Sequence, residues 1–281
     1  ANPSLWRQSR LNAISGLFEV VPGIYQIRGF DLANMSFVRG DTGWIVVDPL
    51  TANETAEAGL ELLRENVEDL PISAVIITHS HADHFGGVKG VITPEEIEAR
   101  DVPVIAPEGF FEEAVSENLL AGNTMSRRAG YMYGNLIEKG PEGTLGSGLG
   151  TTTAAGTFTI VEPTIEITET PTELTVDGIE MTFLNTPGAE APAELMFYIH
   201  PFEAMMQAEI INHTLHNLCT LRGAKVRSGD LFAKYINDTI NRFGESVEVS
   251  FGSHHWPTWG NAEILDFWEG QRDTYRYIHD E

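Results

Sequence analysis

The chain has 281 residues, of which 42% are hydrophobic, with 27 Gly and 14 Pro, and this composition indicates an ordinary globular α/β protein. The formal charge of −24, from 41 acidic and 17 basic residues, argues against nucleic-acid binding because such a field repels phosphates. No apolar run approaches the roughly 20 residues of a membrane-spanning helix, and the single cysteine, Cys219, excludes intrachain disulfides and multi-cysteine metal sites.

The first half of the chain predicts strands followed by an alternation of helix and strand. Runs of β-branched and aromatic residues broken by Gly and Asp predict strands. These strands are expected at 24–30, 35–40, 43–50, 72–80 and 102–107. Apolar residues at helical spacing predict a helix over 53–67, with Asn53 as its N-cap, and a second helix ends at about residue 120.

A Gly/Thr-rich stretch, residues 139–156, separates the two halves. A phosphate-binding loop is one interpretation of this stretch. It lacks a Gly-Lys-Ser/Thr ending and a strand directly before it, so an active-site lid or a surface loop is the preferred interpretation.

The second half repeats the theme of strands followed by helices. Strands are expected at 172–178, 179–186, 194–200 and 246–253. Helices are expected at 213–222, 229–243 and 261–280. Two similar halves without an internal repeat or a linker predict one domain over 1–281, an α/β sandwich of two sheets flanked by helices.

The strongest chemical signal is "THSHADHFGG", residues 78–87, which brings His79, His81, Asp83 and His84 to the end of an apolar strand. Strand periodicity puts 79, 81 and 83 on one side, and a turn can bring His84 round to them. Imidazoles and a carboxylate suit Zn²⁺, and four such groups exceed one catalytic site, which indicates two metals. The alternative is a polar turn with incidental histidines.

The two glycines that end this motif, Gly86 and Gly87, are expected to let the following helix pack close beneath the site.

The pattern His-x-His-x-Asp-His resembles the signature of the metallo-β-lactamase superfamily. That resemblance implies an αββα sandwich with a metal site at one edge of its two sheets. Three further ligands are then expected at later strand ends. Thr186-Pro187-Gly188 is followed by Glu190 instead of the usual His, Glu209 is the candidate bridging acid, and His254 is the final His.

Acids in place of a His and an Asp point to one branch, the alkylsulfatases that hydrolyse detergent-like sulfate esters. The resemblance covers essentially the whole chain. It rests on "NPSLWRQSRLN", "ANMSFVRG", "GWIVVDPL", "THSHADHFGGVKG", "VIAPEGF", "SENLLAGNTMSRRAGYMYGN", "TPGAEAPAE", "HTLHNLCTLRGAKVR" and "SHHWPTWG".

The resemblance implies a dinuclear zinc site. One zinc is expected to bind His79, His81 and Glu190, and the other Asp83, His84 and His254. Glu209 and a water are expected to bridge the two ions, with Glu209 and Asp83 among the catalytic residues. The bridging hydroxide would release an alcohol and inorganic sulfate, with attack at carbon.

The same resemblance implies a sulfate-binding set of Asn217 and Arg222, with Arg222 also counted as catalytic. Two zinc ions, three carboxylates and a hydroxide leave the metal core near neutral, so the sulfate needs its own cation. Arg222 is the strong local candidate, because its planar fork of donors suits tetrahedral oxyanions. The alternative for Arg222 is a cation at a helix C-terminus.

Several other residues are open to more than one interpretation. Tyr133, with Tyr131, either lines the substrate pocket or packs in the core. His216 is a residue supporting the site, a proton donor, or a histidine packed on a helix. His255 is expected to support the site from behind the ligands, and Glu194 to belong to the scaffold.

Two other functions compete with alkyl sulfate hydrolysis. One is a different hydrolase on the same fold, such as a lactonase, thioesterase or β-lactamase, and the fold alone does not separate them. The other is a non-catalytic zinc-binding module.

The resemblance also carries expectations about the longer protein. We interpret residues 1–281 as a catalytic domain and a fragment, without the N-terminal lead, the helical dimerisation region and the C-terminal lipid-binding-like domain of the family. A homodimer through those other segments and a periplasmic or secreted location are expected.

Overall fold

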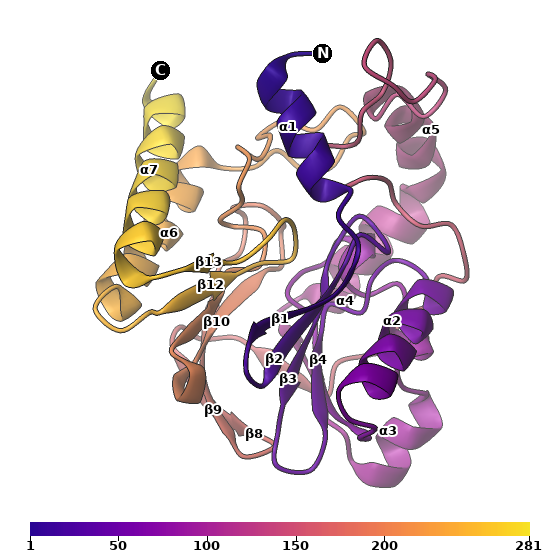
Figure 1. Cartoon of the computed structure of the whole chain (residues 1–281), viewed down its shortest axis with the longest axis vertical. Coiled ribbons are helices and arrows are strands. Elements are labelled where there is room, and N and C mark those ends of the chain that lie inside the picture. The colour runs from indigo at the N-terminus through magenta and orange to yellow at the C-terminus, as the bar shows by residue number, and fades with distance from the viewer.

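The computed structural model describes all residues, 1–281, and forms two sheets packed face to face with helices on both outer sides (Figure 1). The first sheet has seven strands, in chain order. They are β1 (Gly16–Val21), β2 (Ile24–Arg28), β3 (Met35–Arg39), β4 (Trp44–Val47), β5 (Ile72–Ile76), β6 (Val104–Pro107) and β7 (Ile165–Ile167). Strands β1 to β4 form an antiparallel meander, and β4 to β7 run parallel.

The second sheet has six strands. Their order across the sheet is β13 (Thr258–Trp259), β12 (Val249–Phe251), β11 (Ala204–Met206), β10 (Leu195–Ile199), β9 (Ile179–Asn185) and β8 (Thr172–Val176). Only β11 and β12 are parallel neighbours.

Helices cover both outer faces of the sandwich (Figure 1). Helices α2, α3 and α4 lie outside the first sheet, and α6 and α7 lie outside the second. Helices α1 and α5 lie at the end of the sandwich where both chain termini are found. The bounds are α1 (Pro3–Asn12), α2 (Asn53–Asn66), α3 (Pro94–Arg100), α4 (Phe110–Val115), α5 (Gly122–Met132), α6 (Gly229–Phe243) and α7 (Asn261–Asp280). None of them is both long and apolar enough to cross a membrane.

Three apolar layers hold this arrangement together. Along β4, Val46 packs toward the helices of the first half, whereas Ile45 and Val47 pack between the sheets, and all three side chains are fully buried. A third layer joins the second sheet to α6 and α7 through Phe232 and Trp268. The continuous apolar runs of the sequence therefore reflect strands buried on both faces, and the predicted αββα sandwich is confirmed.

The longest periodic segments folded as predicted. Helices over 53–66, 229–243 and 261–280 match the expected ranges within one residue. The strand expected at 72–80 ends at Ile76, and that expected at 246–253 is shortened to β12. The stretch 139–156 is irregular, and no helix follows it, so a phosphate-binding loop is ruled out.

Three local predictions were wrong. Residues 213–222 form turns and irregular backbone instead of a helix. Asn53 is the first residue of α2 and not its cap; its Oδ1 accepts a hydrogen bond from Thr159 Oγ1 at 2.8 Å. A Cβ at Gly87 would lie 2.3 Å from the Pro49 carbonyl oxygen, so the close neighbour of this glycine is the chain before α2 and not the following helix.

Three helices, α1, α3 and α5, had no range predicted from the sequence. The chain between α4 and α5 continues through a π-helical turn, Ser116–Leu120. Such turns are uncommon and are often found at functional sites.

Candidate metal centre

The predicted ligands come from the ends of strands in both sheets. His79 and His81 follow β5 in the first sheet, whereas Glu190, Glu209 and His254 follow β9, β11 and β12 in the second. These strand ends meet at one end of the sandwich. The structure therefore brings together segments that lie more than a hundred residues apart in the sequence.

The first group of ligands contains His79, His81, Glu190 and Glu209, all buried. His79 Nε2 lies 3.1 Å from Glu209 Oε2 and 3.6 Å from Glu190 Oε2. His81 Nδ1 lies 3.0 Å from Glu190 Oε2. The four potential ligand atoms all lie within 4.8 Å of one another, which is compatible with one ion held between them.

The second group contains Asp83, His84 and His254. His84 Nε2 lies 3.3 Å, and His254 Nε2 3.7 Å, from Asp83 Oδ2. Glu209 approaches this group as well, with Oε2 3.5 Å from His84 Nε2 and Oε1 3.2 Å from His254 Nε2. Glu209 is therefore the one carboxylate in contact with both groups, as a bridging ligand would be.

The buried polar atoms of the two groups fit metal ions. His79 Nε2, His84 Nε2, His254 Nε2 and Glu190 Oε2 are all buried without a hydrogen-bond partner. Leaving such atoms unpaired costs about 1–3 kcal/mol each. Bound cations would satisfy all of them, and imidazoles and carboxylates are among the ligands that divalent metals such as zinc accept.

Neighbouring cationic groups favour the ionised form of Glu190 and Glu209 despite the burial of both carboxyls. Burial alone would raise the pKa of Glu190, but the Arg227 guanidinium and His81 hold it well below its usual range. Burial likewise opposes ionisation of Glu209, and His254 and His216 lower the pKa of that carboxyl well below its usual range. Charged carboxylates are the form that a metal binds.

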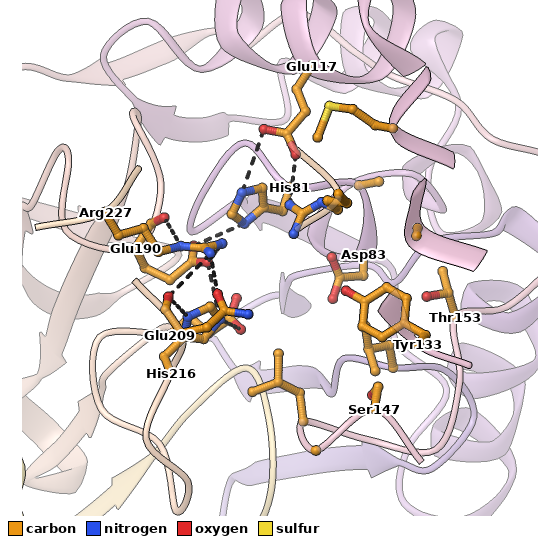
Figure 2. Close-up of a pocket in the computed structure, with 18 of the residues that line it drawn as sticks. His81, Asp83, Glu117, Tyr133, Ser147, Thr153, Glu190, Glu209, His216 and Arg227 are labelled. Carbon is orange, nitrogen blue, oxygen red and sulfur yellow. Dashed lines mark hydrogen bonds and ion pairs between the residues drawn. The ribbon is translucent and has the colours of Figure 1, made fainter. Parts of the chain in front are cut away.

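A pocket of about 370 Å³ opens directly onto the two ligand groups (Figure 2). His81, Asp83, Glu190 and Glu209 form its floor. Its walls come from three segments, 117–133, 147–153 and 214–227. All three predicted substrate-binding residues line this pocket, namely Tyr133, Asn217 and Arg222.

The comparisons with known proteins agree with this geometry. Residues 28–179 match the family model described as the metallo-beta-lactamase superfamily. The chain belongs to the metallo-β-lactamase superfamily.

Within this superfamily the chain is similar to alkylsulfatases along its full length. It is 51% identical over 280 residues to a linear primary-alkylsulfatase of a Pseudomonas species, covering 100% of this chain and 42% of that protein. It is 43% identical to an alkyl/aryl-sulfatase of Saccharomyces cerevisiae, covering 100% of this chain and 43% of that protein. A solved structure of a stereoselective inverting sec-alkylsulfatase from a Pseudomonas species superimposes with a TM-score of 0.96 at 42% identity, covering 100% of this chain and 44% of that chain. The chain thus spans less than half the length of these relatives.

Hydrogen bonds behind the ligands fix the histidine rings of this superfamily site. His84 Nδ1 contacts Asp48 Oδ2 at 3.0 Å, and His254 Nδ1 contacts the Leu32 carbonyl oxygen at 3.1 Å. Each contact leaves the Nε2 atom free to face a metal. Asp48 also accepts hydrogen bonds from Thr78 and Ser253.

Asp48 was not singled out from the sequence. The available signal was an acid directly after a fully buried strand, in "WIVVDPL", the same pattern that drew attention to the histidines.

Glu194 holds the loop that carries Glu190. Its Oε2 accepts hydrogen bonds from the backbone N–H groups of Glu190 and Ala191, both at 3.2 Å. Burial, together with the neighbouring Glu190 and Glu209, raises the pKa of Glu194 well above its usual range. These contacts agree with the scaffold role expected for Glu194.

The pocket contains a second guanidinium that sequence reasoning missed. Arg227 is buried, forms an ion pair with the Glu190 carboxylate, and donates to Asn217 Oδ1 at 2.6 Å. Arg222 is therefore not the only strong local cation, as the charge argument had assumed. The signal was the run of bases in "LRGAKVR", a segment without acids.

Arg222 lies on an irregular segment, so its interpretation as a helix C-terminal cation is wrong. Its Nη2 donates to Glu117 Oε1 at 2.8 Å, and its Nη1 donates to Thr220 Oγ1 at 3.3 Å.

The structure decides between interpretations that the sequence left open for several residues. His216 is not on a helix; its Nε2 lies 3.1 Å from Glu209 Oε1 and 3.3 Å from Glu190 Oε1, beside the ligands (Figure 2). Tyr133 lines the pocket, whereas Tyr131 is 84% exposed, so neither is a core residue. His255 contacts Thr214 Oγ1 at 3.2 Å and Asn12 Oδ1 at 3.1 Å, which ties α1 to the pocket wall.

Proposed function

We propose that this chain carries the active site of a dinuclear zinc alkylsulfatase, which hydrolyses alkyl sulfate esters such as dodecyl sulfate to an alcohol and inorganic sulfate. The observation that carries the proposal is that the buried ligand cluster and two guanidinium groups face one pocket. The similarity to alkylsulfatases supports it, since the most similar relatives described above all act on sulfate esters by name.

The rim of the pocket suits an anionic head group with an alkyl tail. We define the rim as the three wall segments, 117–133, 147–153 and 214–227, in which Glu117 is the one acidic residue. The basic residues of the rim are Arg127, Arg128, Arg222, Lys225 and Arg227. The large apolar side chains exposed on it are Leu119, Leu120, Tyr131, Leu215, Leu221 and Val226.

This local composition explains how an anionic substrate can bind to a chain with a net charge of −24. Exposed charges are screened beyond about 8–10 Å, so a sulfate at the pocket experiences chiefly the rim and the floor. Exposed apolar side chains gathered at one site typically mark a surface that binds an apolar group.

In the proposed mechanism Arg222 and Asn217 bind the sulfate group. Arg227, whose N–H groups already bond to Glu190 and Asn217, adds positive charge beside them. The planar fork of the Arg222 guanidinium matches a tetrahedral oxyanion, and its hydrogen bonds are charge-assisted. Zinc bound at the ligand groups would supply Lewis acidity and lower the pKa of a coordinated water toward 7. Asp83 and Glu209 would hold the zinc beside the sulfate site, and His216, next to Glu209, is the residue available to carry the proton that the attacking water loses to the departing sulfate.

We propose that water attacks carbon and that the C–O bond breaks, with sulfate as the leaving group. One relative is described as inverting, and inversion at a carbon centre requires bond formation at that carbon. Hydrolysis in ¹⁸O-labelled water tests this point. Label in the alcohol is expected, whereas label found only in the sulfate would contradict attack at carbon.

The whole proposal is tested by metal analysis combined with hydrolysis of dodecyl sulfate. About two zinc ions per chain and chelator-sensitive release of sulfate are expected. A β-lactam and a thioester assayed alongside test the other hydrolases of this fold, and faster turnover of either would favour them. Hydrolysis that survives complete metal removal would contradict the zinc assignment.

The resemblance alone supports two further proposals for the longer protein. These are a homodimer formed through segments outside this chain and a periplasmic or secreted location. Sedimentation of the full-length protein and fractionation of the source cells would test them.

A further inference from the structure

A carboxylate without an assigned role, Glu117, lies beside the sulfate-binding arginine. It belongs to the π-helical turn Ser116–Leu120 and points into the pocket toward His81 (Figure 2). Its side chain is only 15% exposed. Every other acid that lines the pocket is one of the proposed metal ligands, Asp83, Glu190 and Glu209.

The contacts of Glu117 leave Arg222 able to bind an anion. Glu117 Oε1 accepts one hydrogen bond from Arg222 Nη2, at 2.8 Å, and Thr220 accepts another from Nη1. A guanidinium has five N–H donors, so three stay available. Glu117 Oε2 lies 3.8 Å from His81 Nε2, which is beyond hydrogen-bond length. Glu117 is therefore a fixed negative charge at the edge of the sulfate site.

A negative charge there acts differently on substrate and product. An alkyl sulfate ester carries one negative charge, whereas the inorganic sulfate released from it carries two at neutral pH. Coulomb repulsion is proportional to the ligand charge, so a nearby carboxylate opposes the dianion twice as strongly as the monoanion.

We propose that Glu117 sets the charge selectivity of this pocket, disfavouring dianionic sulfate relative to monoanionic sulfate esters and thereby promoting product release. The inference rests on the proposed function, because it takes Arg222 as the sulfate ligand. Glu117 is a positioning and selectivity residue here: it holds Arg222 in place and weakens binding of the product.

The test compares two anions that are not turned over, inorganic sulfate and 1-hexanesulfonate, by calorimetry on the zinc-loaded protein. Glu117→Gln keeps the shape of the side chain and removes its charge. At a partly hydrated site, removal of one charge is expected to change affinity roughly threefold to tenfold per unit of ligand charge. The preference for sulfonate over sulfate should therefore fall roughly threefold to tenfold in this variant.

The ratio of the two affinities separates charge selectivity from other effects. If Arg222 merely loses its orientation, both anions weaken together and the ratio stays constant. An unchanged ratio would overturn the inference. Loss of zinc from Glu117→Gln would also overturn it, because the carboxylate would then support His81 instead.

Two further variants sharpen the result. Glu113→Gln is the matched control, since Glu113 lies one turn earlier, pairs with Lys225 at 2.7 Å and does not line the pocket. Its ratio should equal that of the unmodified protein. Glu117→Asp restores the charge and should recover most of the preference.

These measurements do not depend on turnover. A protein that binds both anions with the expected ratio but fails to hydrolyse dodecyl sulfate would contradict the proposed function alone. A protein that hydrolyses it, with a ratio that Glu117→Gln leaves unchanged, would contradict only the role of Glu117.

Discussion

The two ends of the sandwich use acidic side chains in opposite ways. At the end away from the metal centre, Asp177 in the β8–β9 turn accepts hydrogen bonds from the backbone N–H groups of Thr42 and Gly43 and from Thr42 Oγ1, at 2.8–3.1 Å. At the other end, Glu190 Oε1 is paired with Arg227, whereas Glu190 Oε2 is buried without a hydrogen-bond partner, among histidines whose Nε2 atoms are also unpaired. A carboxylate whose oxygens accept hydrogen bonds from the protein's own N–H and O–H groups has a structural role. A buried carboxylate oxygen without such a donor, in a cluster of unpaired ring nitrogens, indicates a site for an external cation.

The comparison predicts that substitutions at the two ends separate function from stability. Changes at the metal end should remove metal and activity, whereas changes at the far end should lower stability and leave the metal in place.

The largest effect is expected from Glu190→Ala. Loss of an outer hydrogen bond to a metal ligand already costs about 10–100-fold in affinity or activity, so loss of the ligand itself should lower hydrolysis by at least two orders of magnitude. Metal analysis should find at least one zinc missing. Glu180→Ala, an exposed residue of β9, the strand before Glu190, is the control and should retain both ions. Retention of both ions by Glu190→Ala would show that the ligand assignment is wrong.

Next in size is Arg222→Ala, which should raise KM for alkyl sulfates while zinc content stays normal. A hydrogen bond to a charged group contributes about 1.5–3 kcal/mol, which corresponds to roughly a 10–150-fold change. Steady-state kinetics and metal analysis measure the two quantities. Lys234→Ala, whose ammonium pairs with Asp238 on the outer helix α6, is the control and should behave like the unmodified protein. Metal loss in Arg222→Ala would mean a structural role.

A smaller effect is expected from Asp48→Asn. Asp48 has a positive φ of 54°, and Asn tolerates this conformation, so the substitution tests the hydrogen bond to His84 without backbone strain. Zinc affinity should fall by about 10–100-fold, measured by competition with a chelator. The exposed Asp69→Asn is the control. Unchanged affinity would show that the orientation of His84 does not depend on Asp48.

The smallest effect on function is expected at the far end, from Asp177→Asn. Burial alone would raise the pKa of Asp177, but hydrogen bonds from Ser73 and Thr42 hold it below its usual range. Because the folded-state pKa is lowered, the stabilisation is present above about pH 4, the unfolded value, and is lost as pH falls. Thermal unfolding at pH 7 should show a loss of about 1 kcal/mol with normal zinc content. The difference from the unmodified protein should shrink as the pH falls below about 4, and a difference that does not shrink would contradict this account.

The sequence predicted those parts of the molecule that local patterns determine. Helices α2, α6 and α7 have apolar residues at helical spacing over ten or more residues, and the histidine motif lies within six. Asp48 and Arg227 escaped notice because their roles depend on partners far along the chain, Ser253 and Glu190 respectively.

The wrong prediction of a helix over 213–222 has a similar cause. The spacing of Leu215, Leu218 and Leu221 imitates a helix, but only Leu218 packs against the core, and the other two are exposed. The polar residues of this segment face the pocket instead, and those contacts override local propensity.

The division of the metal ligands between two sheets has a consequence for how the active protein matures. Histidines after β5 and acids after β9 and β11 meet only when the two sheets have packed together. Neither half of the chain supplies all the ligands of the two proposed metal ions. Complete metal loading is therefore expected only after the two halves have packed together. The time course of zinc binding during refolding would therefore measure when one sheet packs against the other.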